Sequence, residues 1–381
     1  MQNHKQIKVA YLTNILPNYR RGLYEKLFKN QEILLHVYAQ NETCGIKSVL
    51  NEVYPNNIKT VAYKDFLGKR FTWQFLPWID LYKNYDIIKV DGNPRILTHF
   101  LLATIFRLLG KKVILYSMLH SFNNNKLNKL IRITWIKLFK YHLLYNEAEI
   151  EILKENNFSN KVMVAYNNGL DQKLIEVEKN NWTEQKLADW KKENKIENKI
   201  DLLACGRTII GKYEHLLDAI HTIKTSYHNI FCCIIGGGNG LEGLKLKIKQ
   251  LGLEANVRLT DEIYEESKLA PYFISSKIFV HPFAVGLSIN HAFGYGLPII
   301  THDNSLEHGP EIVLFQNETN GLSYQQNNTE DLVSKIMLLI KDEKKTAELG
   351  KNAYDLVSKK YNVDIMADNL IHLINTINKE K

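Results

Sequence analysis

The chain has 381 residues, of which 45% are hydrophobic and 24% charged, with only 8 prolines. This length exceeds what one compact core usually holds, so we expect two domains, and the composition excludes a disordered or fibrous chain. Residues 1–171 contain 24 Lys and Arg against 13 Asp and Glu, whereas residues 172–381 contain 25 against 28. A basic first half indicates an anionic partner such as phosphate or acidic lipid. Nucleic acid is not expected as a partner, because no nucleic-acid-binding motif appears.

Short β-branched runs alternate with longer segments of helical periodicity, which is typical of parallel sheets covered by helices. In the first half, strands are predicted at 7–15, 33–39, 86–92, 111–118, 141–146 and 161–167. In the second half, they are predicted at 200–206, 231–237, 257–261, 278–282 and 298–303. The fold class is therefore α/β, with two Rossmann-like domains expected to face each other across a central cleft.

The expected domain boundaries follow from composition. An N-terminal domain spans 1–171, a Lys- and Glu-rich linker or surface helix spans 172–199, and a C-terminal domain spans 200–360. A final helix within 361–381 is expected to pack back toward the N-terminal domain. Ligands of such sheets bind beyond the carboxyl ends of the strands, so residues that follow strands are the candidates for a site.

The cysteines and apolar runs indicate a cytoplasmic protein. The four cysteines lack CxxC spacing, and the adjacent Cys232 and Cys233 are predicted to point to opposite faces of one strand. They are typical of small core residues in a reducing compartment. The first residues show no signal-peptide pattern, and the best apolar run, 96–106, is too short to span a bilayer.

The segment LLACGRTIIGKYEHLLDAI (202–220) predicts a strand, a Gly206–Arg207 corner, Lys212 and then a helix. An Arg and a Lys near a helix start suit a diphosphate, because the guanidinium binds two oxygens and the ammonium adds charge. The alternative is that both are ordinary surface cations in a loop.

The next segment, 234–252, contains a deceptive dinucleotide fingerprint. The pattern GxGxxG is spelled by Gly238, Gly240 and Gly243, with Glu262 about twenty residues further on. That fingerprint belongs to the first strand of its unit, whereas here it follows the second, so NAD is disfavoured. A glycine-rich turn that lets a ligand approach the backbone at Gly237 and Gly238 is expected instead.

The segment HPFAVGLSINHAFGYGLPIITHD (281–303) predicts a strand, a turn, a short helix and a second strand. Ser288 is expected to cap the helix, whose N-terminus would face the ligand, and Gly296 and Pro298 end it. His291, one turn into the helix, could bond a ribose hydroxyl or a phosphate oxygen. The alternative for His291 is a packing histidine.

Taken in order, these three segments resemble the C-terminal half of GT-B-fold glycosyltransferases of the large retaining family 4. The matching residues are Gly206, Arg207, Lys212, Gly236, Gly237, Gly238, Gly286, Leu287, Ala292, Gly296 and Pro298. Segments 166–175 and 310–324 also resemble family signatures. Phe283 and His291 stand where the family has two donor-binding glutamates. In this respect the chain is similar to a subset of bacterial surface-polysaccharide glycosyltransferases.

The resemblance implies a glycosyltransferase that moves a sugar from a nucleotide-sugar donor to a glycan or lipid-linked acceptor. The pathway implied is bacterial surface polysaccharide or lipopolysaccharide biosynthesis. Transfer is expected to be retaining and metal-independent, with no cofactor beyond a co-substrate such as a UDP- or GDP-sugar. The catalytic residues it implies are Arg207 and Lys212 on the diphosphate and His120 beside the donor, although His120 could also be an ordinary loop histidine. The donor-binding residues it implies are Gly206, Gly237, Gly238, Glu262, Val285, Gly286, Leu287, Ser288 and His291.

Phe283 is expected to favour an apolar donor contact, such as one to a 6-deoxy sugar. No metal site is expected, because the histidines clustered at 281, 291, 302 and 308 lack metal-ligand spacing.

The basic half supplies candidates for the acceptor side and for a membrane. Residues that follow predicted strands are acceptor-side candidates: Asn14, Tyr19, Arg20, Asn93 and Arg95. The predicted helix at 126–140 has an apolar face with Trp135 and a face rich in lysine. Such a helix usually covers a sheet, but it can also lie on an anionic membrane. We therefore also expect peripheral association with the inner face of the cytoplasmic membrane.

Two other functions remain open at this stage. The missing glutamates would suit a catalytically idle nucleotide-sugar-binding subunit that partners an active transferase. A nucleotide-sugar epimerase would share the two-domain cleft and would interconvert donors without an acceptor.

Overall fold

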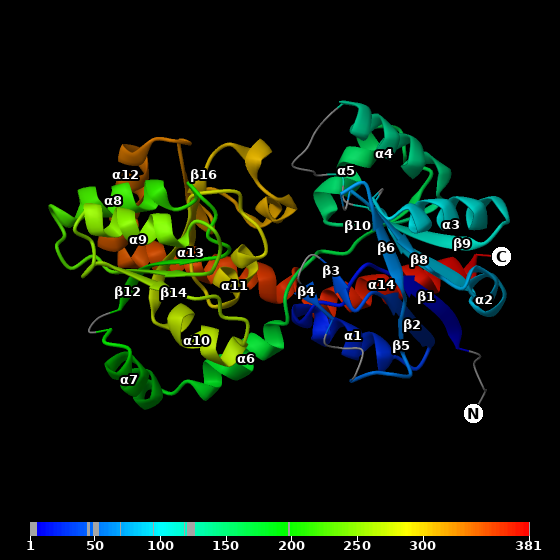
Figure 1. Cartoon of the computed structure of the whole chain (residues 1–381), viewed down its shortest axis with the longest axis horizontal. Helices are drawn as coiled ribbons and strands as arrows, with labels where there is room; N and C mark the ends of the chain where they lie inside the picture. The colour runs from blue at the N-terminus through cyan, green and yellow to red at the C-terminus, as the bar shows by residue number, and fades with distance from the viewer. Residues whose placement is uncertain are drawn as a thin grey trace. The chain divides into compact units, whose positions relative to one another are not determined.

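The computed structural model describes residues 6–43, 46–48, 53–68, 70–93, 95–117, 119, 126–196 and 199–380 (Figure 1). Of residues 43, 46–47, 126–129 and 131–132, only the secondary structure is described. The chain divides into two compact units. Unit 1 comprises residues 1–171 and 362–381, and unit 2 comprises residues 172–361. All eleven predicted strands are present, six in unit 1 and five in unit 2.

Unit 1 is built on a parallel seven-stranded sheet in the order β11-β10-β9-β8-β1-β2-β5. Its strands are β1 (Ile7–Leu12), β2 (Ile33–Ala39), β5 (Ile58–Thr60), β8 (Ile87–Asp91), β9 (Lys112–Ser117), β10 (Tyr141–Leu144) and β11 (Val162–Ala165). The strands are short and rich in β-branched residues, and most of their side chains are buried on both faces of the sheet, as a parallel sheet requires.

Helices cover both faces of the unit 1 sheet. One face carries α1 (Arg21–Phe28) and α14 (Val363–Lys379). The other carries α2 (Trp78–Asn84), α3 (Leu97–Leu108), α4 (Lys126–Leu138) and α5 (Glu147–Glu155). The helix α14 is amphipathic, and its apolar side is completely buried against α1 and the strands. The last helix of the chain therefore completes the core that the first strands begin.

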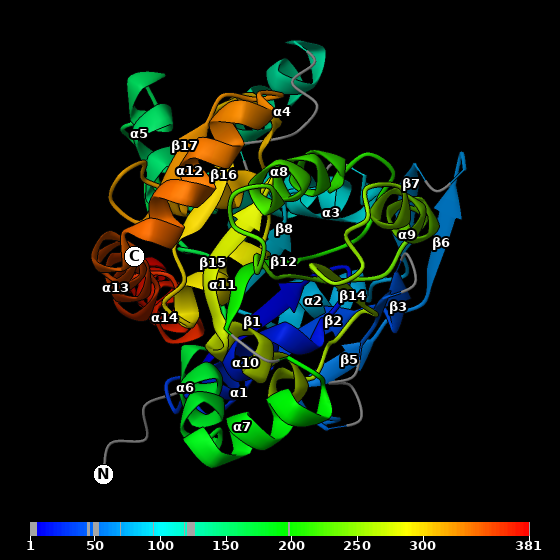
Figure 2. The ribbon, with the colours of Figure 1, turned by 90° about the vertical axis from the view of Figure 1, so that its left-hand side faces the viewer.

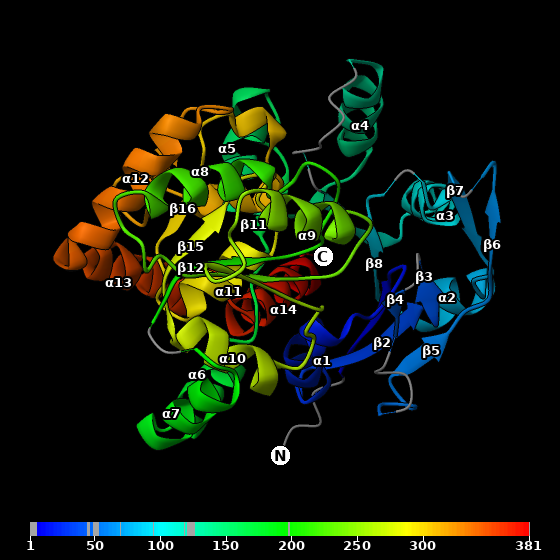
Figure 3. The ribbon, with the colours of Figure 1, turned by 60° about the vertical axis from the view of Figure 1, so that its left-hand side comes forward.

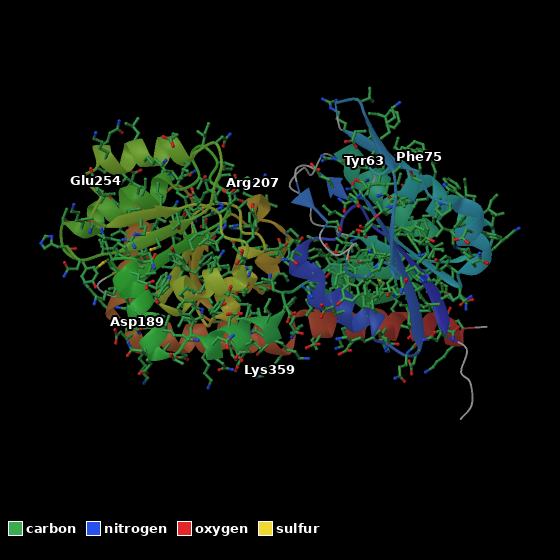
Figure 4. All side chains as sticks on the ribbon, turned by 60° about the horizontal axis from the view of Figure 1, so that its bottom comes forward. Tyr63, Phe75, Asp189, Arg207, Glu254 and Lys359 are labelled. Atoms are coloured by element: carbon green, nitrogen blue, oxygen red, sulfur yellow. The ribbon has the colours of Figure 1, made fainter. Side chains whose placement is uncertain are left out.

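The sequence did not predict β5 or two small antiparallel pairs in unit 1. The pairs are β3 (Glu42–Thr43) with β4 (Ile46–Lys47), and β6 (Tyr63–Phe66) with β7 (Phe71–Gln74). In the second pair, Tyr63 is opposite Gln74, and Phe75 continues the ladder by donating its N–H to the Ala62 carbonyl. Tyr63 and Phe75 accordingly lie close together in Figure 4.

Unit 2 repeats the architecture with a parallel six-stranded sheet in the order β14-β13-β12-β15-β16-β17. Its strands are β12 (Ile200–Cys205), β13 (Cys232–Ile235), β14 (Val257–Thr260), β15 (Ser276–His281), β16 (Ile299–His302) and β17 (Gly321–Tyr324). Cys232 belongs to the core on one face and Cys233 to the core on the other, which confirms the predicted alternation.

The helices of unit 2 lie in two layers, which Figures 2 and 3 show above and below the strands. One layer contains α8 (Glu214–Lys224), α9 (Leu241–Gln250) and α12 (Thr329–Lys341). The other contains α10 (Glu266–Ile274) and α11 (Ser288–Gly294), and α13 (Glu343–Lys359) contributes to both cores.

The stretch 172–199, expected as a linker or surface helix, contains α6 (Gln172–Asn181) and α7 (Glu184–Glu193). Ile175 and Ile196 are buried in the core of unit 2, so this stretch is part of that unit. Among the described helices, none has the length and apolar character needed to cross a bilayer.

Candidate functional site

Each sheet has a point where the strand order reverses, and its crevice is where ligands of such sheets bind. In unit 2 the order reverses between β12 and β15, and in unit 1 between β1 and β8. The loop 206–213 follows β12, and the turn 282–287 follows β15. The predicted cations of unit 2 therefore lie at its reversal point, on the carboxyl side of the strands.

The loop after β12 brings Lys212 back over Gly206. Gly206 has φ +140°, a conformation that favours glycine, and a Cβ added there would lie 3.0 Å from Lys212 Nζ. Tyr213 is fully buried, its hydroxyl donates to the Gly206 carbonyl over 3.4 Å, and its ring centroid lies 4.9 Å from Lys212 Nζ. The ammonium is thus held above the first turn of the loop by the packing of Tyr213.

Lys212 is buried, with 8% of its surface exposed, and makes no ion pair among the described residues. Its pKa is lowered to about 8, mainly by burial; Cys205 acts in the opposite direction, and the neighbouring Arg207 adds to the lowering. Its positive charge also helps to lower the pKa of His281 to about 3, an effect second to the burial of that imidazole. An unpaired buried ammonium is unfavourable for folding, and an anion bound beside it would compensate the charge.

Arg207 lies on the same loop but is exposed. Its side chain extends from the loop that follows β12 (Figure 4). The loop therefore offers one buried cation and one exposed, adaptable cation to the same anion. This arrangement suits a diphosphate, which has oxygens on two phosphorus atoms.

The glycine-rich turn after β13 packs against this loop. A Cβ at Gly236 would overlap the Gly206 carbonyl, and one at Gly238 would overlap the Thr208 carbonyl. The Thr208 N–H donates to the Gly237 carbonyl over 3.0 Å. We expected a ligand to approach the backbone at Gly237 and Gly238. At Gly236 and Gly238, however, the space that a side chain would need is filled by the backbone of the loop 206–213. Glycine at these two positions therefore lets the glycine-rich turn pack closely against that loop.

Glu262 follows β14 and reaches Gly237. A Cβ at Gly237 would overlap the Glu262 carboxylate in its present position, so the two groups lie in direct proximity. Both residues are at least partly exposed. The structure thus brings Glu262 to the glycine-rich turn, which itself packs against the loop 206–213.

The turn after β15 differs from the expectation in two details. Ser288 does not cap α11: the cap position is Leu287, which makes no side-chain cap, and Ser288 is the first helical residue. The N–H groups of Ile289 and Asn290 donate to the Gly286 and Leu287 carbonyls, so these two groups are not available to a ligand.

Val285, another predicted donor contact, is fully buried. Its N–H donates to Nδ1 of His308 over 3.1 Å, and its carbonyl accepts from the Gly309 N–H over 2.9 Å. Through these two bonds, Val285 holds the turn 282–287 against the segment that contains His308 and Gly309. A Cβ at Gly286 would meet nothing within 4 Å, which leaves the backbone of Gly286 open on that side.

His291 is paired with a carboxylate that the sequence analysis did not identify. Its Nε2 lies 3.0 Å from Oε2 of Glu266 at the start of α10, and the Tyr295 hydroxyl donates to Oε1 of the same carboxylate over 2.7 Å. Burial raises the pKa of Glu266, but the bonds from His291 and Tyr295 outweigh it, and the pKa lies below its ordinary value. The pair is partly exposed, with 23% of the His291 side chain accessible.

Glu266 thus supplies a carboxylate beside a position where the family glutamate is missing. Phe283, at the other such position, is 41% exposed on the turn after β15. An exposed aromatic ring there suits the apolar donor contact that we expected at this position.

In unit 1, the predicted acceptor-side residues divide into exposed and engaged groups. Tyr19, Asn93 and Arg95 are exposed, and Asn14 is partly buried. Arg20 differs from the expectation, because its guanidinium donates to the Gly169 carbonyl over 2.6 Å and to the side chain of Asn168. Arg20 therefore holds the turn at the end of unit 1 together.

A charged pair at the reversal point of unit 1 was also missed. Asp91, the last residue of β8, accepts hydrogen bonds from the buried ammonium of Lys89 and, over 2.6 Å, from the Thr13 hydroxyl that follows β1. The Lys89 ammonium lies 3.6 Å from the Tyr11 ring centroid and 4.7 Å from that of Tyr116. The signal was present in the sequence, since opposite charges two residues apart in a strand share one face.

His120 lies outside the described residues, so its predicted position beside the donor stays a prediction. Within the helix expected to contact a membrane, Trp135 is buried and its ring centroid lies 4.9 Å from that of Phe100 on α3. Trp135 therefore covers the sheet and is not available to lipid. Among the described residues, no group of three His, Cys, Asp or Glu side chains could hold a metal ion.

Comparisons with known proteins show what the chain is similar to. Residues 185–356, somewhat less than half of the chain, match the family model described as glycosyl transferases group 1. No curated protein matches the sequence.

Solved structures match over nearly the whole chain. The Anabaena protein Alr3699/HepE in complex with UDP has a TM-score of 0.70 at 14% identity, covering 98% of this chain and 100% of that one. The lipopolysaccharide outer core galactosyltransferase WaaB has a TM-score of 0.64 at 14% identity, covering 97% and 99%. A protein from Listeria monocytogenes that is described as a UDP-N-acetylglucosamine 2-epimerase has a TM-score of 0.66 at 14% identity, covering 99% of this chain and 98% of that one. The fold, with two Rossmann-like halves, is thus the GT-B fold.

Proposed function

We propose that this protein transfers a sugar from a nucleotide-sugar donor, with the donor's diphosphate held by Lys212 and Arg207 in unit 2. The observation that carries the proposal is the buried ammonium of Lys212, which has no ion-pair partner in the described part of the chain and whose pKa is lowered to about 8, mainly by burial. Perturbed, unpaired charges of this kind occur where a protein binds a ligand of opposite charge. A diphosphate at the reversal point between β12 and β15 would remove the penalty and would also meet Arg207.

In the proposed reaction, the bond between the sugar C1 and the diphosphate oxygen breaks. Positive charge develops on the sugar, and negative charge develops on the β-phosphate. Lys212 and Arg207 stabilise the departing diphosphate, so that cationic side chains perform the role that a metal ion performs in other transferases. The acceptor hydroxyl forms the new glycosidic bond and loses its proton. We propose that the configuration at C1 is retained.

His291 and Glu266 are proposed to bind the donor beside the diphosphate. The Glu266 carboxylate accepts from Tyr295 on one oxygen and faces His291 on the other, so it fixes the orientation of the imidazole. His291 can then present its second ring nitrogen to a donor hydroxyl or phosphate oxygen. This pair restores a carboxylate to the site and therefore disfavours the idle-subunit alternative.

The donor base and the acceptor are proposed from the structural relatives. HepE has been crystallised with UDP and with UDP-glucose, which supports a UDP-sugar as donor. WaaB acts on the lipopolysaccharide outer core, which supports a glycan or lipid-linked hydroxyl in a surface polysaccharide as acceptor.

Binding and turnover of UDP-sugars test the proposal. Isothermal titration is expected to give UDP binding that is about 10- to 150-fold weaker in the Lys212→Met variant and about tenfold weaker in Arg207→Gln. Lys249→Met, which removes an exposed lysine from α9, is the matched control and should bind UDP like the wild type. UDP binding of equal strength in all four proteins would contradict the assignment of the site.

The Listeria neighbour keeps an epimerase as the second candidate. Proton NMR of a UDP-sugar incubated with the protein separates the two activities. Release of UDP with free or transferred sugar supports the transferase, whereas a new epimer still attached to UDP identifies an epimerase.

A further inference from the structure

The outer faces of α2 and α3 in unit 1 carry apolar side chains that no described part of the chain covers. Each of the following side chains is more than a third exposed: Ile79, Tyr82, Leu101, Ile105, Leu108 and Leu109. We call this set the α2–α3 patch. Ile79 at 73% and Leu108 at 78% are among the most exposed apolar residues in the described chain.

Contacts between the two helices make the patch continuous. The Tyr82 ring on α2 packs against Phe106 of α3 at 5.5 Å between centroids, and its hydroxyl donates to the Leu109 carbonyl over 3.3 Å. Along α3, Leu101, Ile105 and Leu108 recur at helical spacing and therefore share one side. Both helices pack on the same face of the unit 1 sheet, where Figure 1 labels them.

The composition of α3 explains why this side is exposed. The helix lies in the apolar run 96–106, which is too short to span a bilayer, and it is apolar on nearly every side. Its inner side, including Leu102 and Phe106, is buried on the sheet, so its outer side is left over. A contiguous apolar patch of this kind marks an interaction surface, unlike single exposed leucines.

Positive charge surrounds the patch. Lys83 and Arg107 are exposed, and Lys111 lies beside Tyr82, donating to its carbonyl over 2.6 Å with its ammonium 5.3 Å from the ring centroid. Two carboxylates, Asp80 and Asp86, also lie on or beside these elements, and the charge of Asp86 acts on the Lys111 ammonium. Asp80 accepts from the Tyr38 hydroxyl and from Asn84, and Asp86 accepts from the Lys8 N–H over 2.8 Å.

We propose that the α2–α3 patch is a docking surface for an anionic lipid bilayer. The apolar side chains would enter the boundary between headgroups and acyl chains, and the surrounding cations would contact lipid phosphates. A second copy of this chain fits the patch less well, because a symmetric pairing would bring the cations around one patch, Lys83, Arg107 and Lys111, toward the cations around the other. The proposal does not depend on the reaction proposed above.

Sedimentation with lipid vesicles tests the surface directly. The full chain is mixed with vesicles of phosphatidylcholine alone or with about a third phosphatidylglycerol, and the bound fraction is measured over a range of lipid concentration. The double variant Ile79→Ser, Leu108→Ser changes only exposed side chains and is expected to bind the anionic vesicles about tenfold more weakly. Lys83→Gln is expected to weaken binding about fivefold, with the difference disappearing at high salt.

The matched control is Leu246→Ser with Lys249→Gln on α9 of unit 2, where both residues are also exposed. This control should bind vesicles like the wild type. No binding of the wild type to anionic vesicles would overturn the proposal, as would equal losses in the patch variant and the control. A wild-type dimer in sedimentation velocity that Ile79→Ser, Leu108→Ser converts to monomer would assign the patch to self-association and would also overturn it.

Discussion

Replacing Lys212 with methionine should stabilise the unliganded protein while weakening its binding of a diphosphate. In the folded chain the pKa of Lys212 is about 8, against the ordinary value of 10.5, and burial is the main cause. A difference of about 2.5 pKa units corresponds to about 3 kcal/mol at pH 7, because one unit is worth about 1.4 kcal/mol. Methionine has a similar length and no charge, so most of that penalty should disappear.

The expected rise in Tm is about 4–10 °C, since about 1 kcal/mol shifts a unit of this size by about 2–4 °C. Kd for UDP should rise about 10- to 150-fold in the same variant, the loss of one charge-assisted hydrogen bond. Thermal unfolding with and without UDP, together with titration calorimetry, measures both effects. The control Lys249→Met should change Tm little, because that side chain is exposed.

The direction of the pH dependence follows from the lowered pKa. Below pH 8 the lysine is charged in both the folded and unfolded chains, so the full penalty is present. Between pH 8 and 10.5 the folded chain loses its proton first, so wild-type stability rises with pH and the advantage of Lys212→Met shrinks. UDP affinity of the wild type should fall above pH 8, because binding then requires uptake of a proton. A variant that is less stable than wild type and still binds UDP normally would refute this reasoning.

Four further outcomes are expected. Arg207→Gln should weaken UDP binding about tenfold with little change in Tm, because the side chain is exposed. Gly238→Ala should lower stability by more than about 2 kcal/mol, because its φ is +147° and a Cβ would overlap the Thr208 carbonyl. Gly243→Ala should instead raise stability by about 0.5–1 kcal/mol, because a Cβ on this exposed residue of α9 would meet no atom within 4 Å and alanine favours a helix. Denaturant unfolding measures the stability of both glycine variants. Glu266→Gln and His291→Ala should each reduce donor turnover, and the double variant should lose no more than the worse single variant; fully additive losses would show that the two residues act independently.

The sequence predicted the strands well because the main determinants are local. β-branched runs between polar loops define β1, β2 and β8 to β16, and two Rossmann-like units were inferred from their alternation with helices. The GT-B fold was implied only by the resemblance of the motifs to a known family. The strands β6 and β7 were missed because β6 is exposed, β7 is only partly buried except at Gln74, and the two mix aromatic, charged and hydroxyl side chains. Such a hairpin lacks the regular alternation of apolar and polar residues by which a strand is recognised in a sequence.

The candidate site was predicted in part for a similar reason. Gly206, Arg207 and Lys212 lie within seven residues, so their proximity follows from one loop. The burial of Lys212 depends on Tyr213 and on β15, which the spacing of the motif does not reveal. Glu266 is 25 residues from His291 and meets it only because α10 packs beside α11. Contacts of that kind depend on tertiary packing, and a single sequence carries little signal for them.

The helix α14 has a consequence for how the chain acquires its structure during synthesis. Its buried side closes the core over β1, β2 and α1, so one face of the first sheet lacks its cover until residues 363–379 have been made. Residues 172–361 must be translated in between, which at about 5–20 residues per second takes roughly 10–40 s. Unit 2 is contiguous in sequence and can fold during that interval. The nascent first unit meanwhile exposes the aggregation-prone apolar face that α14 will cover, which a ribosome-associated chaperone would need to shield.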